Sequence, residues 1–422
     1  MVDLAKHRFS FFLFAVLFIA TASMLAISLA KGYRLDLKNK SLKPTGIMVL
    51  NSSPAGASIF INGKLKSATN DSFSLEPGNY HVELKKEGFF DWKKDLQVKA
   101  ELVTFAEAYL FPKVPDLKPL TFDGAYSPQI SPDRTKIVFS LPLPNPKAGL
   151  WILDLNESLF GLSKPIRQIA KSRLSIDFAK MNYFWAPDSR QIILENPSTQ
   201  KIYLLDSTKV NDLTPDLEIT QTYPTLKEQW QKEENLKIKP KIAKLPLPLQ
   251  EIIASKSANF QFSPDNTKIL YQATASAEIP ENLIPPVLAA STQKQSRHLV
   301  PGKFYVYDIK EDKNFVLPFE LPLPTPTPKP KKIKPTPTPT VFFSENSFIS
   351  KPVWFPTSNH LIWFKEDKVF ACEYDGNNLT VIYSGPMIKP FVFLADKPER
   401  LIILNQISTE ENPNLFSVSF KP

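Results

Sequence analysis

The sequence predicts an all-β protein that follows a single N-terminal apolar helix. Three observations support this prediction: an uncharged apolar stretch at residues 9–30, strand-like alternation within residues 45–111, and a short unit that recurs between residues 115 and 422. The chain has 422 residues, enough for two or three domains. Gly occurs only 12 times against 40 Pro, which excludes a fibrous protein with a glycine period.

The recurring unit combines a turn with a strand. An apolar residue lies two positions before a proline, a polar turn follows, and an apolar run resumes five positions after the proline. Proline sets φ for the first corner of a type I turn, and Asp or Ser fixes the next corner through local hydrogen bonds. Four copies occupy residues 130–137, 185–192, 262–269 and 354–361.

A second strand follows each turn unit and ends at an aspartate, at residues 151–154, 203–206, 305–308 and 372–375. A weaker fifth copy runs from residue 394 to residue 419. These repeats resemble the blades of TolB-type β-propellers. The resemblance implies that residues 115–422 form a closed ring of five or six blades, in which neighbouring blades protect the strand edges.

The repeats are unevenly spaced, at 55, 77 and 92 residues between prolines, against about 40 to 45 for a typical blade. Insertions explain the excess. Residues 208–258 include a charged stretch around Trp230 that predicts a short helix over 226–237. Residues 272–302 are expected to form a surface loop, and 321–340 a Pro-, Thr- and Lys-rich linker that cannot bury a core.

Residues 45–111 predict a small all-β sandwich. Ile47, Val49, Ile59 and Ile61 alternate with smaller or polar residues, and turn pairs stand at Asn62-Gly63 and Pro77-Gly78. The run 53–57, Ser-Pro-Ala-Gly-Ala, and the turn at 75–80 resemble the PEGA domain of the bacterial envelope, with Ala55 in place of the motif glutamate. The resemblance implies an adhesion or spacer module without catalytic residues.

The uncharged stretch 9–30 is long enough to span a bilayer, since 22 helical residues extend about 33 Å and a hydrocarbon core measures about 30 Å. We expect a transmembrane anchor between a short cytoplasmic tail (1–8) and a basic juxtamembrane linker (31–44). A cleaved signal peptide is the alternative, because Ser28-Leu29-Ala30 suits a cleavage site. The basic linker favours the bulk of the chain inside, whereas Lys6 and Arg8 give the form of a signal anchor with the bulk outside, which is our prediction.

The formal charge of +9 lies outside the predicted folded regions. Residues 1–8 carry +1, and residues 31–43 and 329–334 carry +4 each, so the remaining segments sum to zero. Nucleic-acid binding therefore loses its main electrostatic support. We expect the basic stretch 31–43 to lie against anionic lipid headgroups.

The sequence offers no convincing catalytic, cofactor or metal site. The four histidines lack metal-ligand spacing, and there is no Gly-x-Ser-x-Gly elbow and no glycine-rich phosphate loop. Asp133, Asp188 and Asp265 recur where a turn requires them, so we interpret them as turn formers. The histidines are His7, His81, His298 and His360.

The aromatic residues and the single cysteine are also interpreted structurally. Trp185, Phe262 and Trp354 share one repeat position, which favours core packing, and Cys372 lies in an apolar strand. Trp92 and Trp230 lie outside the repeat and are weaker candidates for surface contact.

Together these features predict a non-catalytic, membrane-anchored envelope protein whose propeller binds a protein or cell-wall polymer outside the membrane. The sequence predicts no cofactor. The alternative is a carbohydrate-processing or other hydrolytic propeller with a divergent site. A glycosidase of this kind needs two placed carboxylates or equivalent groups. A transmembrane sensor is a third possibility, weakened by the short tail.

Overall fold

The computed structural model describes residues 8–30, 32–36, 41–156, 165–173, 176–320, 351–395, 400–408 and 412–420. The chain divides into two compact units, which we describe separately. The first contains the residues up to Phe111 together with Pro286–Gln293, and the second contains the rest. Most of the predicted tail 1–8 and the whole predicted linker 321–340 lie outside the described residues.

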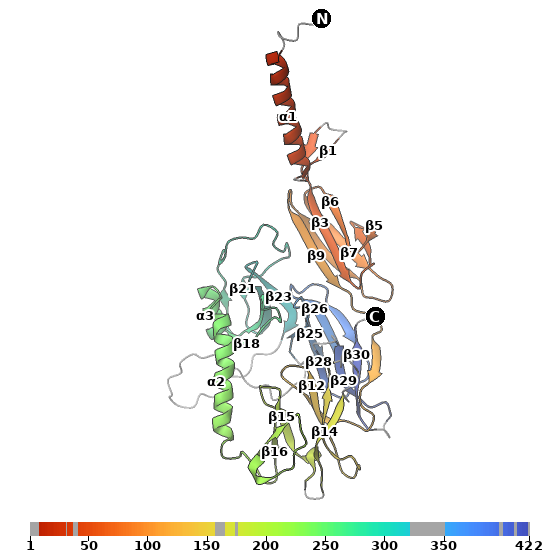
Figure 1. The fold of residues 1–422 in the computed structure, drawn as a ribbon, viewed down its shortest axis with the longest axis vertical. Helices are drawn as coiled ribbons and strands as arrows, with labels where there is room; N and C mark the ends of the chain where they lie inside the picture. The colour runs from red at the N-terminus through yellow and green to blue at the C-terminus, as the bar shows by residue number, and fades with distance from the viewer. Residues whose placement is uncertain are drawn as a thin grey trace. The chain divides into compact units, whose positions relative to one another are not determined.

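Helix α1 (Arg8–Ala30) forms the apolar N-terminal segment of the first unit (Figure 1). Residues Ser10–Leu29 are long and apolar enough to cross a membrane. The helix ends in a Schellman motif, because the N–H of Gly32 donates to Leu29 O at 3.1 Å and the N–H of Tyr33 donates to Ser28 O at 2.9 Å. Gly32 has φ +92°, a conformation in which glycine avoids the strain of a side chain.

The remainder of the first unit is a sandwich of two sheets, with strand orders β6-β3-β9 and β5-β4-β7-β8. Strands β3 and β9 pair in parallel, and the other pairs are antiparallel. The bounds are β3 (Gly46–Ser53), β4 (Ser58–Ile61), β5 (Lys64–Ala68), β6 (Asp71–Leu75), β7 (Gly78–Lys85), β8 (Trp92–Val98) and β9 (Val103–Tyr109), preceded by a small hairpin of β1 (Arg34–Asp36) and β2 (Ser41–Lys43).

The turn between β4 and β5 follows the sequence prediction. Asn62 and Gly63 have φ of 51° and 75°, the pair of positive values that a type I′ hairpin requires. Ile59 and Ile61 are buried, as the alternation suggested. In β3, however, the buried residues are Met48 and Leu50, and the side chain of Ile47 is exposed.

Trp92 is not a surface residue, which corrects the suggestion from the sequence. It is buried in the sandwich core together with Met48, Leu50, Val82 and Leu84. Trp92 opens β8 and its ring points to the side of the strand that faces the other sheet, because β8 buries every second residue from Trp92 onward except one. An aromatic at a loop boundary thus serves packing.

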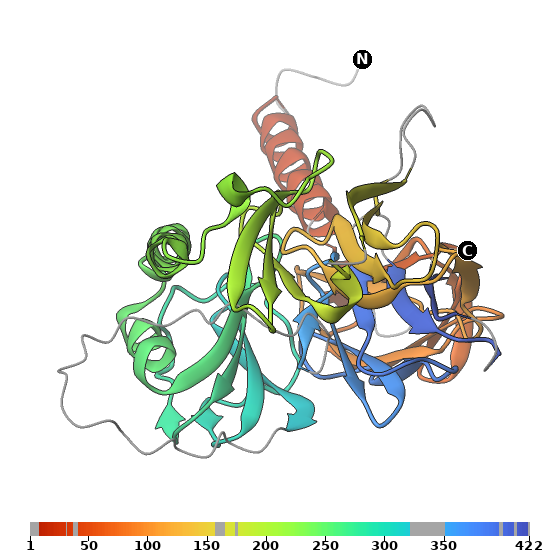
Figure 2. The same cartoon turned by 90° about the horizontal axis from the view of Figure 1, so that it is seen from below.

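The second unit is a β-propeller. Its described residues form five sheets of three or four antiparallel strands, which follow one another around a centre in Figure 2. Blade 1 is β11 (Tyr126–Ile130), β12 (Lys136–Leu141), β13 (Gly149–Asp154) and β14 (Ile166–Lys171); blade 2 is β15 (Asn182–Trp185), β16 (Gln191–Asn196) and β17 (Lys201–Asp206). Blade 3 is β18 (Ser257–Phe262), β19 (Lys268–Ala273), β22 (Lys303–Asp308) and β23 (Lys313–Glu320). Blade 4 is β24 (Val353–Trp354), β25 (His360–Lys365), β26 (Lys368–Glu373) and β27 (Thr380–Tyr383), and blade 5 contains β28 (Val392–Ala395), β29 (Arg400–Asn405) and β30 (Asn414–Ser419).

The ring is closed by strands from its two ends. Strand β10 (Asp116–Pro119) pairs with β30 and completes blade 5, so the first and last strands of the propeller lie in one sheet. Blades 5 and 1 also share a core cluster that contains Ile137, Phe139, Phe393 and Ile402. Hydrogen bonding and apolar packing therefore both join the last blade to the first.

The insertion at 208–258 is more helical than the sequence predicted. Helix α2 (Tyr223–Ile242) extends beyond the expected 226–237 at both ends, and a second helix, α3 (Leu247–Ser255), was not foreseen. Trp230, the other candidate for surface contact, is buried against Ala186 and Ile193 of blade 2. A surface role for Trp230 is therefore wrong, because the helix uses this ring to attach to the sheet.

The insertion predicted at 272–302 begins later than expected, since Gln272 and Ala273 belong to β19 and are buried. The remainder contains a small hairpin of β20 (Ala277–Glu278) and β21 (His298–Leu299). A buried ion pair holds this insertion to blade 3, with Arg297 Nη2 at 3.1 Å from Asp312 Oδ1. Tyr307 Oη of β22 donates to the same Asp312 oxygen at 2.8 Å.

Candidate functional site: the polar turns of the repeat

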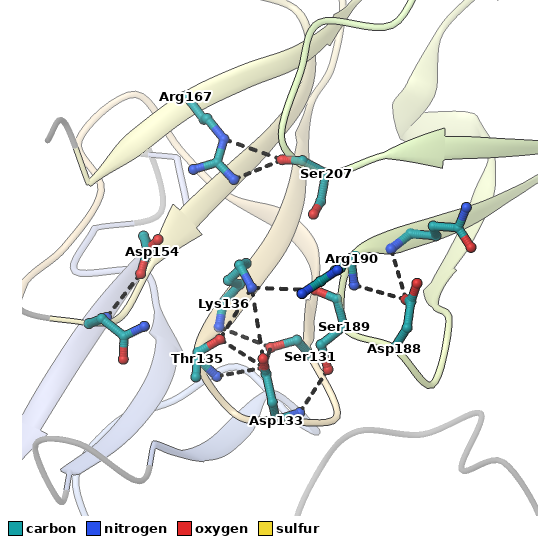
Figure 3. Close-up of polar contacts among 12 residues, drawn as sticks. Ser131, Asp133, Thr135, Lys136, Asp154, Arg167, Asp188, Ser189, Arg190 and Ser207 are labelled. Carbon is teal, nitrogen blue, oxygen red and sulfur yellow. Dashed lines mark hydrogen bonds and ion pairs between the residues drawn. The ribbon is translucent and has the colours of Figure 1, made fainter. Parts of the chain in front are cut away.

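The polar turns between the first two strands of blades 1 to 4 carry the residues that the sequence singled out. In blade 1, the N–H of Arg134 donates to Ser131 O at 2.8 Å, which closes the turn over Pro132. Asp133 Oδ1 accepts from the N–H of Thr135 at 3.1 Å and from Ser131 Oγ at 2.6 Å (Figure 3). The carboxylate thus holds the turn from both sides.

The other copies repeat this arrangement. Asp188 Oδ1 accepts from the N–H groups of Arg190 and Gln191 at 2.9 and 3.0 Å, and Asp265 Oδ1 accepts from the N–H of Thr267 at 3.0 Å. The interpretation of these aspartates as turn formers agrees with these contacts. The residue two positions after each proline has a positive φ between 56° and 61°, at Arg134, Ser189, Asn266 and Ser358.

A second set of aspartates lies at or just after the end of the third strand in blades 1 to 4. The sequence marked these residues only as strand ends. Each accepts a hydrogen bond from the backbone N–H two residues later, which caps the next turn. The pairs, at 2.8 to 3.1 Å, are Asp154 with Asn156, Asp206 with Thr208, Asp308 with Lys310 and Asp375 with Asn377.

The electrostatics of two of the turn aspartates, Asp133 and Asp265, favour the ionised form. Partial burial raises the pKa of Asp133, but hydrogen bonds from Ser131 and Thr135 and the charge of Lys136 outweigh it and lower the pKa below its ordinary value. The pKa of Asp265 is lowered in the same way by its own serine, threonine and lysine neighbours. These carboxylates are hydrogen-bond acceptors and are poorly suited to donate a proton in acid catalysis.

The turn of blade 1 also binds the turn of blade 2. The N–H of Asp133 donates to Ser189 Oγ at 3.0 Å, and Lys136 Nζ donates to Ser189 O at 3.3 Å (Figure 3). Trp185 Nε1 of blade 2 donates to Gln129 O of blade 1 at 3.0 Å. One serine and one tryptophan of the second blade therefore satisfy backbone groups of the first.

Blades 3 and 4 are joined by the same contacts at equivalent positions. The N–H of Asp265 donates to Ser358 Oγ at 3.1 Å, and Trp354 Nε1 donates to Gln261 O at 3.2 Å. Lys268 Nζ donates to Asn359 Oδ1 at 3.3 Å, in the place where Lys136 contacts Ser189. The turn and the aromatic before it thus form a repeated joint between blades, which sequence reasoning missed.

One contact crosses between blades that are not neighbours in the chain. Arg134 Nη1 of blade 1 donates to Trp354 O of blade 4 at 3.1 Å. Arg134 occupies the positive-φ position of its turn, where the other copies have Ser or Asn. Because the Arg134 side chain is longer than Ser or Asn, it can extend from the turn of blade 1 to the backbone of blade 4.

Charge is buried at the joint between blades 3 and 4. The buried Lys268 faces Asp308 across the β19–β22 pair, and its Nζ lies 4.6 Å from the centre of the Tyr374 ring. Burial raises the pKa of Asp308, and the charge of Lys268 offsets part of this effect. The face of the Tyr374 ring therefore stabilises a buried cation at the joint.

The described histidines lie on separate elements. His81 of β7 has Nδ1 at 2.7 Å from Asp95 and Nε2 at 3.3 Å from Glu83, and the Asp95 hydrogen bond contributes most to raising its pKa. His298 pairs with Glu278 of the small hairpin, and His360 is buried beside Thr357. His7 lies outside the described residues. Within the described ranges, no group of three or more His, Cys, Asp or Glu is arranged to hold a metal ion.

The repeat aromatics and Cys372 are core residues. Trp185 and Trp354 are buried in the clusters that join blades 1 with 2 and 3 with 4. Phe262, itself in blade 3, is partly buried against a core cluster of that blade. Cys372 is buried in the same cluster as Trp354, and burial raises the pKa of its thiol. A buried thiol of raised pKa is a poor nucleophile.

The fold and these joints define a β-propeller, preceded in the chain by a β-sandwich and an apolar helix. Residues 45–110 match the PEGA domain. No curated protein matches the chain.

Solved structures that resemble the chain share little sequence with it. They include TolB of Agrobacterium tumefaciens, at 12% identity over 70% of this chain and 73% of that one, with a TM-score of 0.20. TolB of Acinetobacter baumannii matches at 10% identity over 81% and 60%, with a TM-score of 0.19. The β-propeller domain of the Trilobed protease of Pyrococcus furiosus, described as having an open velcro topology, matches at 11% identity over 89% and 96%, with a TM-score of 0.20.

Proposed function

We propose that this protein is a non-catalytic binding or scaffold protein that presents its propeller outside the membrane to a protein or to a cell-wall polymer. The observation that carries the proposal is the use of the repeat carboxylates. Asp133 and Asp265 accept hydrogen bonds within their turns, and their pKa values are lowered. Neither of these two aspartates is therefore suited to be the acid that a glycosidase needs.

The proposal includes a single-pass anchor in the cell membrane, supported by the length and composition of Ser10–Leu29. We place the N-terminus inside and the bulk of the chain outside, because Lys6 and Arg8 precede the apolar stretch. The PEGA match of residues 45–110 agrees with an envelope module between anchor and propeller. Nucleic acid is not a proposed partner, because the excess positive charge belongs to the segments that flank the helix and to 329–334.

The orientation can be tested by thiol labelling on whole cells. The native Cys372 is buried and should not react with a membrane-impermeant maleimide. A Phe122→Cys variant places a thiol at a position where the native side chain is 79% exposed on the propeller. We expect labelling of Phe122→Cys in intact cells, equal to that in lysed cells; labelling only after lysis would contradict the proposed orientation.

The binding role can be tested with the detergent-solubilised full chain. We expect it to co-sediment with isolated cell-wall sacculi, or to retain an envelope protein after crosslinking in cells, without releasing reducing ends or peptides from either. Hydrolysis that persists through purification would replace this proposal with the alternative of a carbohydrate-processing or other hydrolytic propeller.

A further inference from the structure

The outer face of the β6-β3-β9 sheet carries an exposed patch of apolar side chains. Ile47 pairs with Val103, and Val49 pairs with Phe105, across the parallel β3–β9 ladder. The side chains of Ile47, Val103 and Phe105 are exposed, at 39%, 46% and 57%, and Val49 is partly buried. We call these four residues the apolar face. Apolar neighbours on one side of a sheet mark a surface that another phase or partner covers.

The apolar face begins where the sandwich is attached to the apolar helix. Thr45, just before β3, donates its hydroxyl to Gly32 O at the end of α1, and the N–H of Glu101 donates to Thr45 O at 3.0 Å. A Cβ at Gly32 would lie 3.2 Å from Thr45 O, so the two segments are in close contact. Ile47 and Val103 are the first outward residues after this joint.

Strand geometry sets the distance of these residues from the hydrocarbon core. The span Ser10–Leu29 extends about 30 Å as a helix, which matches the thickness of that core. Ile47 lies two residues beyond Thr45, about 7 Å along the strand, and the headgroup layer adds about 5 to 7 Å on each side. Phe105, level with Val49, lies about 13 Å beyond Thr45, so it reaches the headgroup layer only when the sandwich leans toward the bilayer on the side of its outer face.

The groups around this end of the sandwich are those found at a membrane surface. Tyr33 Oη donates to Glu101 at 3.0 Å, and Arg34 Nη2 lies 3.4 Å from Ser74 Oγ on the strand beside Ile47. Lys43 pairs with Glu76 at 3.2 Å. Tyrosine with a cluster of cations suits the interface of an anionic bilayer.

We propose that the sandwich leans toward the bilayer that α1 spans, so that the apolar face lies in the headgroup layer. The sandwich then rests against the lipid through Ile47, Val103 and Phe105, while the cations beside it meet anionic headgroups. The inference depends on the proposed membrane anchor and adds to it a second, peripheral contact with the same membrane. Such a contact limits the angles through which the sandwich can swing on its short connection to the helix.

Single-cysteine fluorescence in vesicles tests the contact. In a Cys372→Ala background, the full chain is labelled with an environment-sensitive dye at one position and reconstituted into vesicles of phosphatidylcholine and phosphatidylglycerol that contain nitroxide-headgroup lipid. The test positions are Val103→Cys, Phe105→Cys and Glu107→Cys, successive outward residues of β9. Leu65→Cys is the matched control, since Leu65 is an apolar residue of the other sheet with 63% exposure. Ile19→Cys, in the middle of α1, reports the anchor itself.

We expect blue-shifted, quenched emission at Val103 and Phe105, weaker quenching at Glu107, and unquenched emission at Leu65. If Ile19 is protected in the bilayer but Phe105 behaves like Leu65, the contact is overturned and the anchor stands. If the dye at position 19 also shows the emission of a water-exposed site, both the proposed membrane anchor and the proposed lipid contact are overturned. A blue shift at Phe105 that follows protein concentration without lipid quenching would assign the face to a second copy of the chain and likewise overturn the proposal.

Discussion

The backbone N–H of Asp133 in blade 1 donates to the Ser189 hydroxyl of blade 2 at 3.0 Å, and Asp265 and Ser358 repeat this bond between blades 3 and 4 at 3.1 Å. The serine stands two positions after the proline of its own turn, at a positive φ. One turn residue therefore serves two purposes, since it completes its own hairpin and accepts from the preceding blade. The polar positions of the repeat therefore have a role within the turn and a second role between blades.

Replacing this serine should weaken the joint. We expect Ser189→Ala and Ser358→Ala each to lower the free energy of unfolding of the propeller by about 1 kcal/mol, because a partly buried N–H loses its acceptor. Alanine keeps a Cβ at the positive φ, so the change reports the hydroxyl. Thermal unfolding followed by tryptophan fluorescence measures it, with the exposed Ser198→Ala as the control. Equal melting temperatures for all three variants would show that the bond contributes nothing.

Thr121, just after β10, links the two ends of the ring through its side chain. Its buried hydroxyl accepts from the N–H of Leu415 at 2.9 Å, across 294 residues of chain, and donates to Asn414 Oδ1 at 2.9 Å. Thr121→Val keeps the shape and removes both bonds, so we expect a loss of about 1 to 3 kcal/mol in unfolding free energy. The control is Thr199→Val on an exposed turn. Urea unfolding of the full chain in detergent compares them; a Thr121→Val midpoint equal to that of the control would contradict this role in closure.

The lowered pKa values of Asp133 and Asp265 predict a pH dependence of stability. Their folded pKa lies below the ordinary value of 3.8, so at low pH the unfolded chain binds more protons than the folded one. Their contribution is therefore fully present above the unfolded pKa and is lost as pH falls through the folded pKa. Melting temperatures between pH 2.5 and 6 should fall below about pH 4. The fall should be shallower in the Asp133→Asn, Asp265→Asn double variant; an unchanged slope would mean that these two groups do not produce it.

Gly46 tests how closely the sandwich is packed. A Cβ there would lie 2.3 Å from Lys99 O and 2.6 Å from a Val98 methyl carbon, whereas a Cβ at Gly78 meets nothing closer than 3.8 Å. We expect Gly46→Ala to destabilise the sandwich by about 1 to 3 kcal/mol, since the neighbouring backbone must shift, and Gly78→Ala to be nearly neutral. Limited proteolysis of the sandwich ranks the two variants. Equal resistance of the two variants to proteolysis would show that the backbone at residues 98–102 can shift to accommodate the new Cβ without loss of stability.

The Arg297–Asp312 ion pair should show the asymmetry of a buried pair. Arg297→Met leaves the Asp312 carboxylate buried without its cation, with hydrogen bonds only from Tyr307 Oη and from the N–H of Leu283 among the described contacts, and we expect a loss of about 3 kcal/mol or more. Replacing both residues, as Arg297→Met with Asp312→Asn, should cost less than the single change, because Asn is neutral, still offers an acceptor oxygen to the donors around it and tolerates the φ of 51° at this position. Hydrogen exchange of β22 and β23 measures both variants; a double variant less stable than the single one would contradict this account.

Much of the architecture could be predicted from the sequence because it is local. The Asn62-Gly63 hairpin, the turn aspartates and the apolar helix each depend on residues within a few positions of one another, where φ preferences and short-range hydrogen bonds act. The propeller could also be predicted from the repeats, because the same aromatic position recurs in the core of successive blades. Hairpin turns and strand periodicity depend on neighbouring residues, so both can be recognised in the sequence without knowledge of the fold.

The tertiary structure decided what depends on contacts between distant residues. The alternation in β3 did not determine which of its two sets of side chains faces the core. Packing against the second sheet buries Met48 and Leu50 and leaves Ile47 exposed. Isolated tryptophans at 92 and 230 could not be assigned until a core formed around them. The joint between Asp133 and Ser189 spans 56 residues, and no local pattern marks a hydroxyl as the acceptor of another blade's N–H. By itself the sequence determined the turns and the ring they repeat around; only the folded chain decided which side chains lock the blades together and which are left facing outward.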